Sequence, residues 1–120
     1  VATPVTHQNQ RRVNMTISRI SCEQAHQLMQ ADNCQVVDVR DAQSYALGHA
    51  AGAQLLNNDT LPGFIAQADQ AAPTLVFCYH GNSSQQAAAF LQEQGFGDVH
   101  SIDGGFEMWR QQYPSDIDKA

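Results

Sequence analysis

The residue most suited to chemistry is Cys78, which stands between an apolar run and an amphipathic segment. The run from Thr74 to Phe77 follows a proline and is rich in β-branched and aromatic residues, which predicts a short buried strand. Apolar residues then recur at helical spacing between 87 and 91, with Ser83 or Ser84 as the expected N-cap. At such a junction unpaired N–H groups and the helix dipole stabilise an anion, and the thiolate is the nucleophilic form of cysteine. We therefore expect Cys78 to be the catalytic nucleophile.

The loop that follows Cys78 is built to donate hydrogen bonds. Gly81 allows the backbone to turn so that successive N–H groups point inward, and His80 adds positive charge if it is protonated. Asn82, Ser83 and Ser84 add side-chain donors. Such a cradle also suits Cys–S–S⁻, an anion with the same needs. On these residues alone a second interpretation stays open, in which Cys78 is a buried residue at the end of a strand and the loop is only a turn.

Strand patterns alternate with helix patterns along the whole chain, which predicts parallel strands joined by crossovers in a layered α/β domain. Arg40 and Asp103, like Cys78, come directly after predicted strands, so we expect them at the same carboxyl edge of the sheet. The predicted strands are 16–20, 35–39, 53–56, 74–77 and 99–102. The predicted helices follow Ser21, which forms a capping-box pattern with Gln24, the N-caps Asp41 and Thr60, Ser83 or Ser84, and Gly105.

Length and composition limit the possible classes. The 120 residues predict one domain, 16–120, preceded by a polar and aperiodic arm, 1–15, that we expect to be disordered. Our hypothesis is that this arm derives from recombinant expression and that Met15 is the natural start. The net charge of −6 and the lack of basic clusters argue against nucleic acid and anionic membranes as partners. The longest apolar runs are too short for a transmembrane span.

The cysteines and histidines do not form the pattern of a metal site. Cys22, Cys34 and Cys78 are an odd number without CxxC spacing, and the five histidines are scattered. An odd count favours a reducing, cytoplasmic location over a disulfide framework. We expect Cys22 and Cys34 to be apolar packing residues, and the pattern does not favour zinc binding.

Three motifs of this chain are Cys-Tyr-His-Gly-Asn-Ser at 78–83, the segment 37–41 with Tyr45 and 48–53, and the segment 103–109. Together they resemble the rhodanese-like sulfurtransferase family. The segment 78–83 is similar to the active-site loop of its short, single-domain GlpE-type thiosulfate sulfurtransferases, 37–53 resembles its amino-proximal motif, and 103–109 resembles its carboxy-proximal motif. The resemblance implies that neither a metal nor an organic cofactor is required. The resemblance covers about 17–114 and implies a three-layer domain with a central, mostly parallel five-stranded sheet flanked by helices.

The resemblance also implies a double-displacement reaction. The Cys78 thiolate would take the outer sulfur of thiosulfate, release sulfite and become a persulfide, and cyanide or a thiol would then accept the sulfur. The N–H groups from Tyr79 to Ser84 would stabilise both anions. The implied partners are these small molecules and a small redox protein such as thioredoxin, with the oligomeric state left open. Arg40 is interpreted as electrostatic or structural support, and an ion pair with Asp38, Asp41 or Asp103 is its expected role.

The loop departs from many relatives, because positions 79 to 83 contain neither arginine nor lysine. We therefore expect weak thiosulfate binding. The alternatives are a persulfide relay module for a partner protein, an inactive scaffold, and a phosphatase or arsenate reductase of related fold. The last class has a loop one residue longer and closed by an arginine, whereas this chain has Ser84 at that position.

Overall fold

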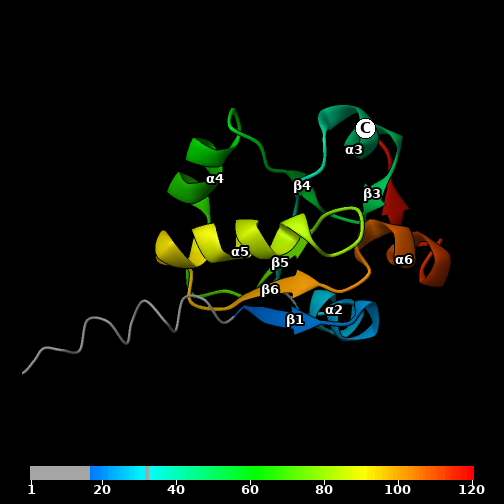
Figure 1. The fold of residues 1–120 in the computed structure, drawn as a ribbon, viewed down its shortest axis with the longest axis horizontal. Coiled ribbons are helices and arrows are strands. Elements are labelled where there is room, and N and C mark those ends of the chain that lie inside the picture. Colours follow the sequence, from blue (N-terminus) through cyan, green and yellow to red (C-terminus); the bar gives the residue numbers. More distant parts are fainter. Residues whose placement is uncertain (1–16, 32) are drawn as a thin grey trace, which may run out of the picture.

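The computed structural model describes residues 17–31 and 33–120, in which strands and helices alternate along the chain (Figure 1). The elements are β1 (Ser18–Ile20), α2 (Cys22–Met29), β2 (Gln35–Asp38), α3 (Ala42–Leu47), β3 (His49–Ala50), β4 (Gln54–Leu55), α4 (Leu61–Gln67), β5 (Thr74–Phe77), α5 (Ser83–Glu93), β6 (Val99–Ile102), α6 (Gly105–Gln112) and β7 (Ile117–Asp118).

The main sheet has five strands in the order β1-β6-β5-β2-β4, and all neighbouring pairs are parallel. The central strand β5 is buried along its whole length, as expected for a parallel strand covered on both faces. Because the strands are parallel, the residues that follow β2, β5 and β6 emerge at one edge. The prediction of an α/β domain built on a parallel five-stranded sheet is confirmed.

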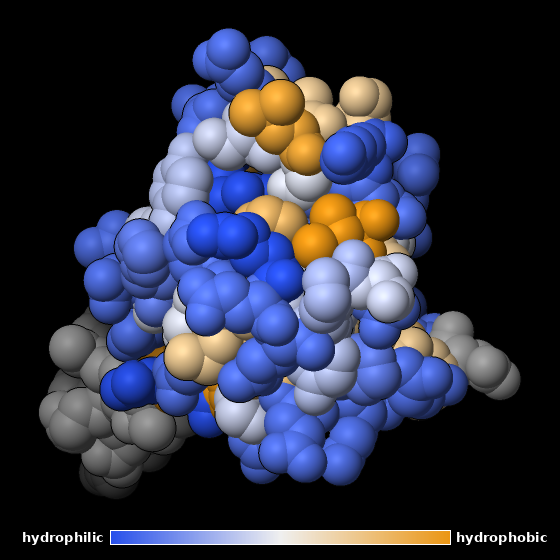
Figure 2. All heavy atoms as spheres, turned by 90° about the vertical axis from the view of Figure 1, so that its right-hand side faces the viewer, coloured by the Kyte–Doolittle hydropathy of each residue, from blue (hydrophilic) through white to orange (hydrophobic). Residues whose placement is uncertain are grey.

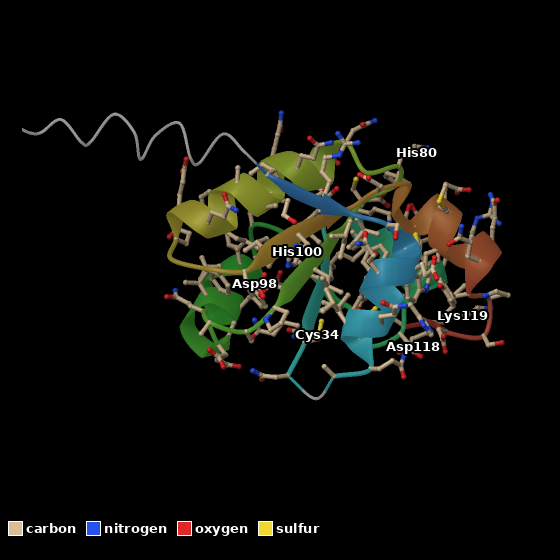
Figure 3. All side chains as sticks on the ribbon, turned by 90° about the horizontal axis from the view of Figure 1, so that it is seen from below. Cys34, His80, Asp98, His100, Asp118 and Lys119 are labelled. Carbon is tan, nitrogen blue, oxygen red and sulfur yellow. The ribbon has the colours of Figure 1, made fainter. Side chains whose placement is uncertain are left out.

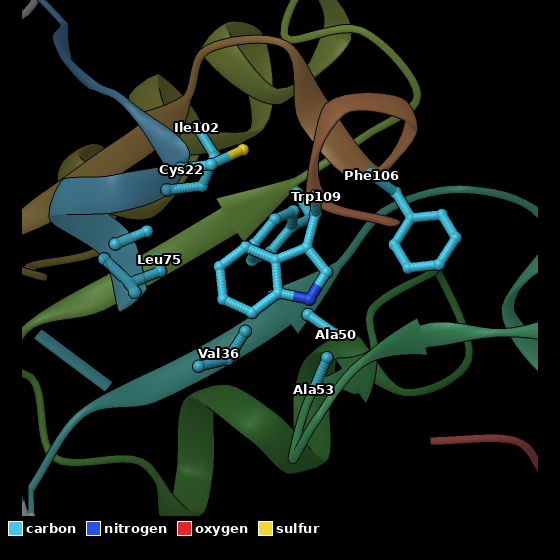
Figure 4. Packing of buried hydrophobic residues seen from close by; sticks show 10 residues of the cluster. Cys22, Val36, Ala50, Ala53, Leu75, Ile102, Phe106 and Trp109 are labelled. Atoms are coloured by element: carbon cyan, nitrogen blue, oxygen red, sulfur yellow. The ribbon is translucent and has the colours of Figure 1, made fainter. Parts of the chain in front are cut away.

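The helices form the outer two of three layers. Residues that alternate along a strand point to opposite faces, so Leu75 and Phe77 join one buried cluster and Val76 joins the other. Helices α2 and α6 cover the first face, where Trp109 is fully buried in the middle of the cluster (Figure 4). Helices α4 and α5 cover the second face through Phe64, Ala88 and Leu91.

A small ribbon was missing from the predicted elements. Strands β3 and β7 pair antiparallel, with His49 opposite Asp118 and Ala50 opposite Ile117. Two-residue strands have no measurable hydrophobic period, so their pairing depends on how the rest of the fold brings the segments together. The ribbon places the last residues of the chain beside α3, where Ala120 N–H donates to the Ala46 carbonyl.

Of the predicted helix caps, the one of α5 was wrong. Asn82, not a serine, is the N-cap of α5, because the Ser84 hydroxyl is turned into the protein interior. Thr60 occupies the predicted N-cap position of α4, but its hydroxyl donates to the Leu55 carbonyl and makes no capping hydrogen bond. Ser21 forms the predicted capping box with α2, and Asp41 caps α3 through Ser44 N–H at 2.9 Å.

The predictions for residues 1–15 lie outside the described residues. Among the residues that are described, none of the helices is both long and apolar enough to cross a bilayer.

Candidate active site

Cys78 lies directly after β5 at the carboxyl edge of the sheet and is almost completely buried. The chain then turns through 79–82 into α5, so the sulfur lies between the end of a strand and the start of an eleven-residue helix. The strand pairs on both sides with β2 and β6, which holds the cysteine at a fixed place on the edge. The junction expected from the apolar run and the following helix is confirmed.

The sulfur of Cys78 receives hydrogen bonds from its own loop. Gly81 N–H donates to Sγ at 3.1 Å, and the hydroxyl oxygen of Ser84 lies 3.2 Å from Sγ. Burial raises the pKa of the Cys78 thiol, but hydrogen bonds from the side chains of Ser84 and Ser83 and from the backbone of Ser84 and Gly81 outweigh it, so the pKa lies below its ordinary value. The loop therefore favours the thiolate.

Ser101 extends this hydrogen-bond chain and was not among the predicted site residues. Its hydroxyl oxygen lies 2.7 Å from that of Ser84, and both side chains are fully buried. Ser101 belongs to β6, one strand away from Cys78 in the sheet. Its sequence context, between His100 and Ile102, gave no signal of a role at the site, because only the parallel pairing of β5 with β6 brings Ser101 to the loop.

Helix α6 holds the loop by its backbone. Phe106 N–H donates to the Cys78 carbonyl at 2.8 Å, and Glu107 N–H donates to the Tyr79 carbonyl at 3.1 Å. These donors belong to the first turn of α6, where N–H groups have no partner within the helix. The contact requires Gly105, because a Cβ there would lie 2.5 Å from the Cys78 carbonyl oxygen and its φ is +58°.

Gly81 is the corresponding position inside the loop. Its φ is +95°, and a Cβ would lie 2.9 Å from the Ile102 carbonyl oxygen. The Gly81 carbonyl accepts a hydrogen bond from Gln85 Nε2 at 2.9 Å, so α5 also fixes the turn. The expectation that glycine lets the loop fold its N–H groups toward the sulfur is confirmed at Gly81.

The remaining loop side chains form its outer surface. His80, Asn82 and Ser83 are exposed, and Figure 3 shows His80 at the same end of the molecule as α6. Tyr79 is partly exposed and reaches away from the sulfur, with its hydroxyl bonded to the Asp41 carboxylate and to the Ser44 hydroxyl. The Tyr79 hydrogen bond is the first cause that lowers the pKa of Asp41 to about 2.

Arg40 is paired within the protein, as expected. Its side chain is 4% exposed, and its Nη2 donates to Asp38 Oδ2 at 2.7 Å and to the Gly48 carbonyl at 2.6 Å. The guanidinium also lies over the Phe106 ring, 4.3 Å from its centroid. Asp103, one of the alternative partners, binds Arg19 instead.

The other singled-out residues occupy structural positions. His49 is buried, stacks on Tyr45 and hydrogen-bonds the Tyr45 carbonyl at 2.7 Å. Cys22 and Cys34 are free thiols that pack against the core around Trp109. Burial, with a smaller contribution from Asp103, raises the pKa of Cys22 to about 11, so Cys22 is a poor nucleophile. Within 17–31 and 33–120, no group of His, Cys, Asp and Glu has the arrangement of a metal site.

Known proteins resemble this chain in sequence and fold. The model of the Rhodanese-like domain matches residues 21–112. The chain is 57% identical over 101 residues to a thiosulfate sulfurtransferase GlpE of Pseudomonas paraeruginosa, covering 84% of this chain and 91% of that protein. It is 54% identical to the protein of the same name from Stutzerimonas stutzeri, covering 83% and 91%.

The fold resembles solved structures as well. The rhodanese-like domain of an Anabaena protein, determined by NMR, superimposes with a TM-score of 0.76 at 18% identity, covering 88% of this chain and 81% of that one. With the three motifs, the parallel sheet and the loop around Cys78 in place, the chain belongs to the rhodanese-like domain family.

Proposed function

We propose that the protein is a thiosulfate sulfurtransferase in which Cys78 carries the sulfur as a persulfide. Relatives at 54–57% identity that span most of both chains are named thiosulfate sulfurtransferases, which supports the enzyme class and the donor. The observation that carries the assignment to Cys78 is the hydrogen bonding of its buried sulfur by Gly81 N–H and the Ser84 hydroxyl.

The first half-reaction is a displacement at sulfur. The Cys78 thiolate attacks the outer sulfur of thiosulfate, a new S–S bond forms, and the bond to the inner sulfur breaks as sulfite leaves with the electron pair. In the second half-reaction, cyanide or a thiolate attacks the outer sulfur of the persulfide, and Cys78 leaves as the thiolate. Both resting forms are anions, so the same donors stabilise each of them.

The loop residues have distinct roles in this scheme. Gly81 and Ser84 bind the nucleophilic sulfur, while the N–H groups of the loop from Tyr79 to Ser84 bind the outer sulfur of the persulfide. His80 and Asn82 form the entrance for the donor. Arg40 supports the site structurally through Asp38. Cys22, Cys34 and Cys78 are all free thiols, which supports a reducing, cytoplasmic location. In such a compartment a small redox protein such as thioredoxin is one suitable sulfur acceptor.

Mass spectrometry tests the proposal directly. Incubation with thiosulfate should add the mass of one sulfur atom to the wild type and none to Cys78→Ser, and cyanide should remove the added sulfur. A wild type without the adduct, or an adduct that survives in Cys78→Ser, would contradict it. Multiple turnovers with cyanide distinguish an enzyme from a relay that exchanges sulfur only with a partner protein. Cys34→Ser is the matched control and should behave as the wild type.

A further inference from the structure

A hollow of about 390 Å³ lies beside the catalytic loop, between α3, α6 and the β3–β7 ribbon. We call it the α3–α6 hollow. Its lining residues include Arg40, Leu47, Tyr79, Phe106, Arg110 and Lys119. Tyr79 immediately follows Cys78, and Phe106, another lining residue, donates its backbone N–H to the Cys78 carbonyl. The hollow therefore adjoins the backbone of the catalytic loop.

Most of the cationic side chains that the structure describes line this hollow, although the chain as a whole is acidic. The described residues contain four arginines and lysines, and Arg40, Arg110 and Lys119 all line the hollow, leaving only Arg19 elsewhere. Glu107 also lines it, but its carboxylate accepts two hydrogen bonds from Arg110. Lys119 forms no ion pair with any residue in 17–31 or 33–120. Figure 3 shows Lys119 and His80 at the same end of the molecule as α6.

Arg40 is the second observation that points to a ligand. Its side chain is more than nine-tenths buried, and Nε and Nη2 are bonded to Asp38 and to the Gly48 carbonyl. The Nη1 group has no hydrogen-bond acceptor in the part of the chain that the structure describes. A buried guanidinium with a free N–H pair at the wall of a hollow is suited to bind a carboxylate.

The walls and the size of the hollow restrict the ligand further. Leu47 is 74% exposed, and Phe106, Tyr79 and Ile117 add apolar surface. Figure 2 faces this end of the molecule and shows hydrophobic side chains set among hydrophilic ones. The volume falls within the range of sites for organic ligands and far exceeds what a small inorganic anion fills. The site therefore suits an anion with an apolar stem.

We propose that the α3–α6 hollow binds the sulfur acceptor and selects thiols that carry a carboxylate on a short apolar stem. This inference rests on the proposed function. The acceptor loses its thiol proton to solvent, and its thiolate attacks the outer sulfur of the Cys78 persulfide. One S–S bond forms and one breaks, Cys78 leaves as the thiolate, and the acceptor departs as its own persulfide. The exposed pair of Arg110 and Glu107 is weak enough to exchange for a ligand carboxylate.

A pair of thiols matched in length tests the selection. Persulfide-loaded protein is mixed with mercaptopropionate or with its alcohol analogue mercaptopropanol, and the loss of persulfide is followed at several thiol concentrations. Rates are expressed per thiolate, so that the different thiol pKa values of the two compounds do not affect the comparison. Mercaptopropionate should reach half-saturation at a concentration on the order of fivefold lower than mercaptopropanol, which is the effect expected of one partly exposed charge pair. Arg110→Gln with Lys119→Gln should weaken this preference, because of the cationic lining only Arg40 then remains, while Arg19→Gln should retain it in full. Equal half-saturation by the two thiols in the wild type, or an undiminished preference in the double variant, would overturn the inference.

Binding without reaction provides the independent readout. Methylthiopropionate cannot accept sulfur, and its titration should shift the NMR signals of Lys119 and Arg110 in the wild type. If no persulfide forms but these shifts occur, the proposed function is wrong and the hollow still binds carboxylates. If the persulfide forms and the shifts do not occur, the hollow is not the acceptor site and the proposed function stands.

Discussion

The hydroxyl oxygens of Ser84 and Ser101 lie 2.7 Å apart, and neither side chain is exposed to solvent. Only one direction of donation along these hydrogen bonds stabilises a thiolate. Ser101 must donate to Ser84, and Ser84 must donate to the Cys78 sulfur 3.2 Å away. In the thiol form the Cys78 S–H donates to Ser84, and Ser84 can then donate to Ser101. Ser101 therefore orients the hydroxyl that binds the nucleophile, without touching the sulfur itself.

Removal of these hydroxyls should raise the pKa of Cys78. A hydrogen bond to a charged group contributes about 1.5–3 kcal/mol, so Ser84→Ala should raise the pKa of the Cys78 thiol, and Ser101→Ala should raise it by less. The pH dependence of alkylation by iodoacetamide, followed on the Cys78 peptide, measures the change. Burial and Asp98 raise the pKa of Cys34, so that thiol serves as an internal reference and should be unaffected. An unchanged profile in Ser84→Ala would contradict the assignment.

Gly105→Ala should destabilise the fold and the active site together. The new Cβ would lie 2.5 Å from the backbone of Cys78 and Tyr79, at a φ of +58° that disfavours alanine. We expect a loss of about 3 kcal/mol in the free energy of unfolding, measured by urea denaturation, and loss of persulfide formation. Gly63→Ala is the matched control, because nothing lies within 4 Å of its Cβ. It should be neutral or stabilise α4 by up to about 1 kcal/mol, and equal effects of the two variants would refute the argument.

Tyr79→Phe should raise the pKa of Asp41, which the Tyr79 hydroxyl helps to hold near 2. The pKa of Asp41 in the folded protein lies below its ordinary value of 3.8, so this contribution to stability is complete above about 3.8 and is lost as the pH falls through about 2. The difference in Tm between wild type and Tyr79→Phe should therefore be constant near neutral pH and shrink in acid. NMR titration of the Asp41 carboxyl measures the shift directly. A Tm difference independent of pH down to about 2 would show that Asp41 is not involved.

The KM for thiosulfate should be high, on the order of 1 mM or above, because no arginine or lysine stands at positions 79 to 83. His80 is exposed at the loop, so His80→Arg places a permanent charge there and should lower the KM severalfold. The mutation His80→Gln adds no charge and is the control. Steady-state kinetics with cyanide as acceptor provide the measurement. A micromolar KM in the wild type would show that other groups bind the donor.

The sheet and its catalytic edge could be predicted because their signals are local. The apolar run before Cys78 and the helical spacing after it lie within one stretch of chain, and the junction between them is what the structure contains. The alternation of strands and helices likewise implied parallel strands and a shared carboxyl edge.

The contacts that complete the site are not local. Ser101 follows Ser84 by 17 positions, and only the pairing of β5 with β6 brings the two strands together. The sequence predicts Ser83 or Ser84 as the N-cap of α5, because a hydroxyl usually caps a helix. In the structure the Ser84 hydroxyl is bonded to the buried sulfur and to Ser101, so it does not cap the helix. The hollow beside the loop depends on Lys119, which the β3–β7 ribbon carries to α3.

The attachment of the loop to α6 has a consequence for how such proteins diversify. The carbonyls of Cys78 and Tyr79 are bound by backbone N–H groups, so the path of the chain there does not depend on which side chains decorate it. Positions 80 and 82 are exposed, and their side chains can be exchanged without changing the backbone around the sulfur. A library randomised at these two positions should therefore yield folded proteins with altered donor preference, which makes the loop a natural starting point for engineering new sulfur chemistry.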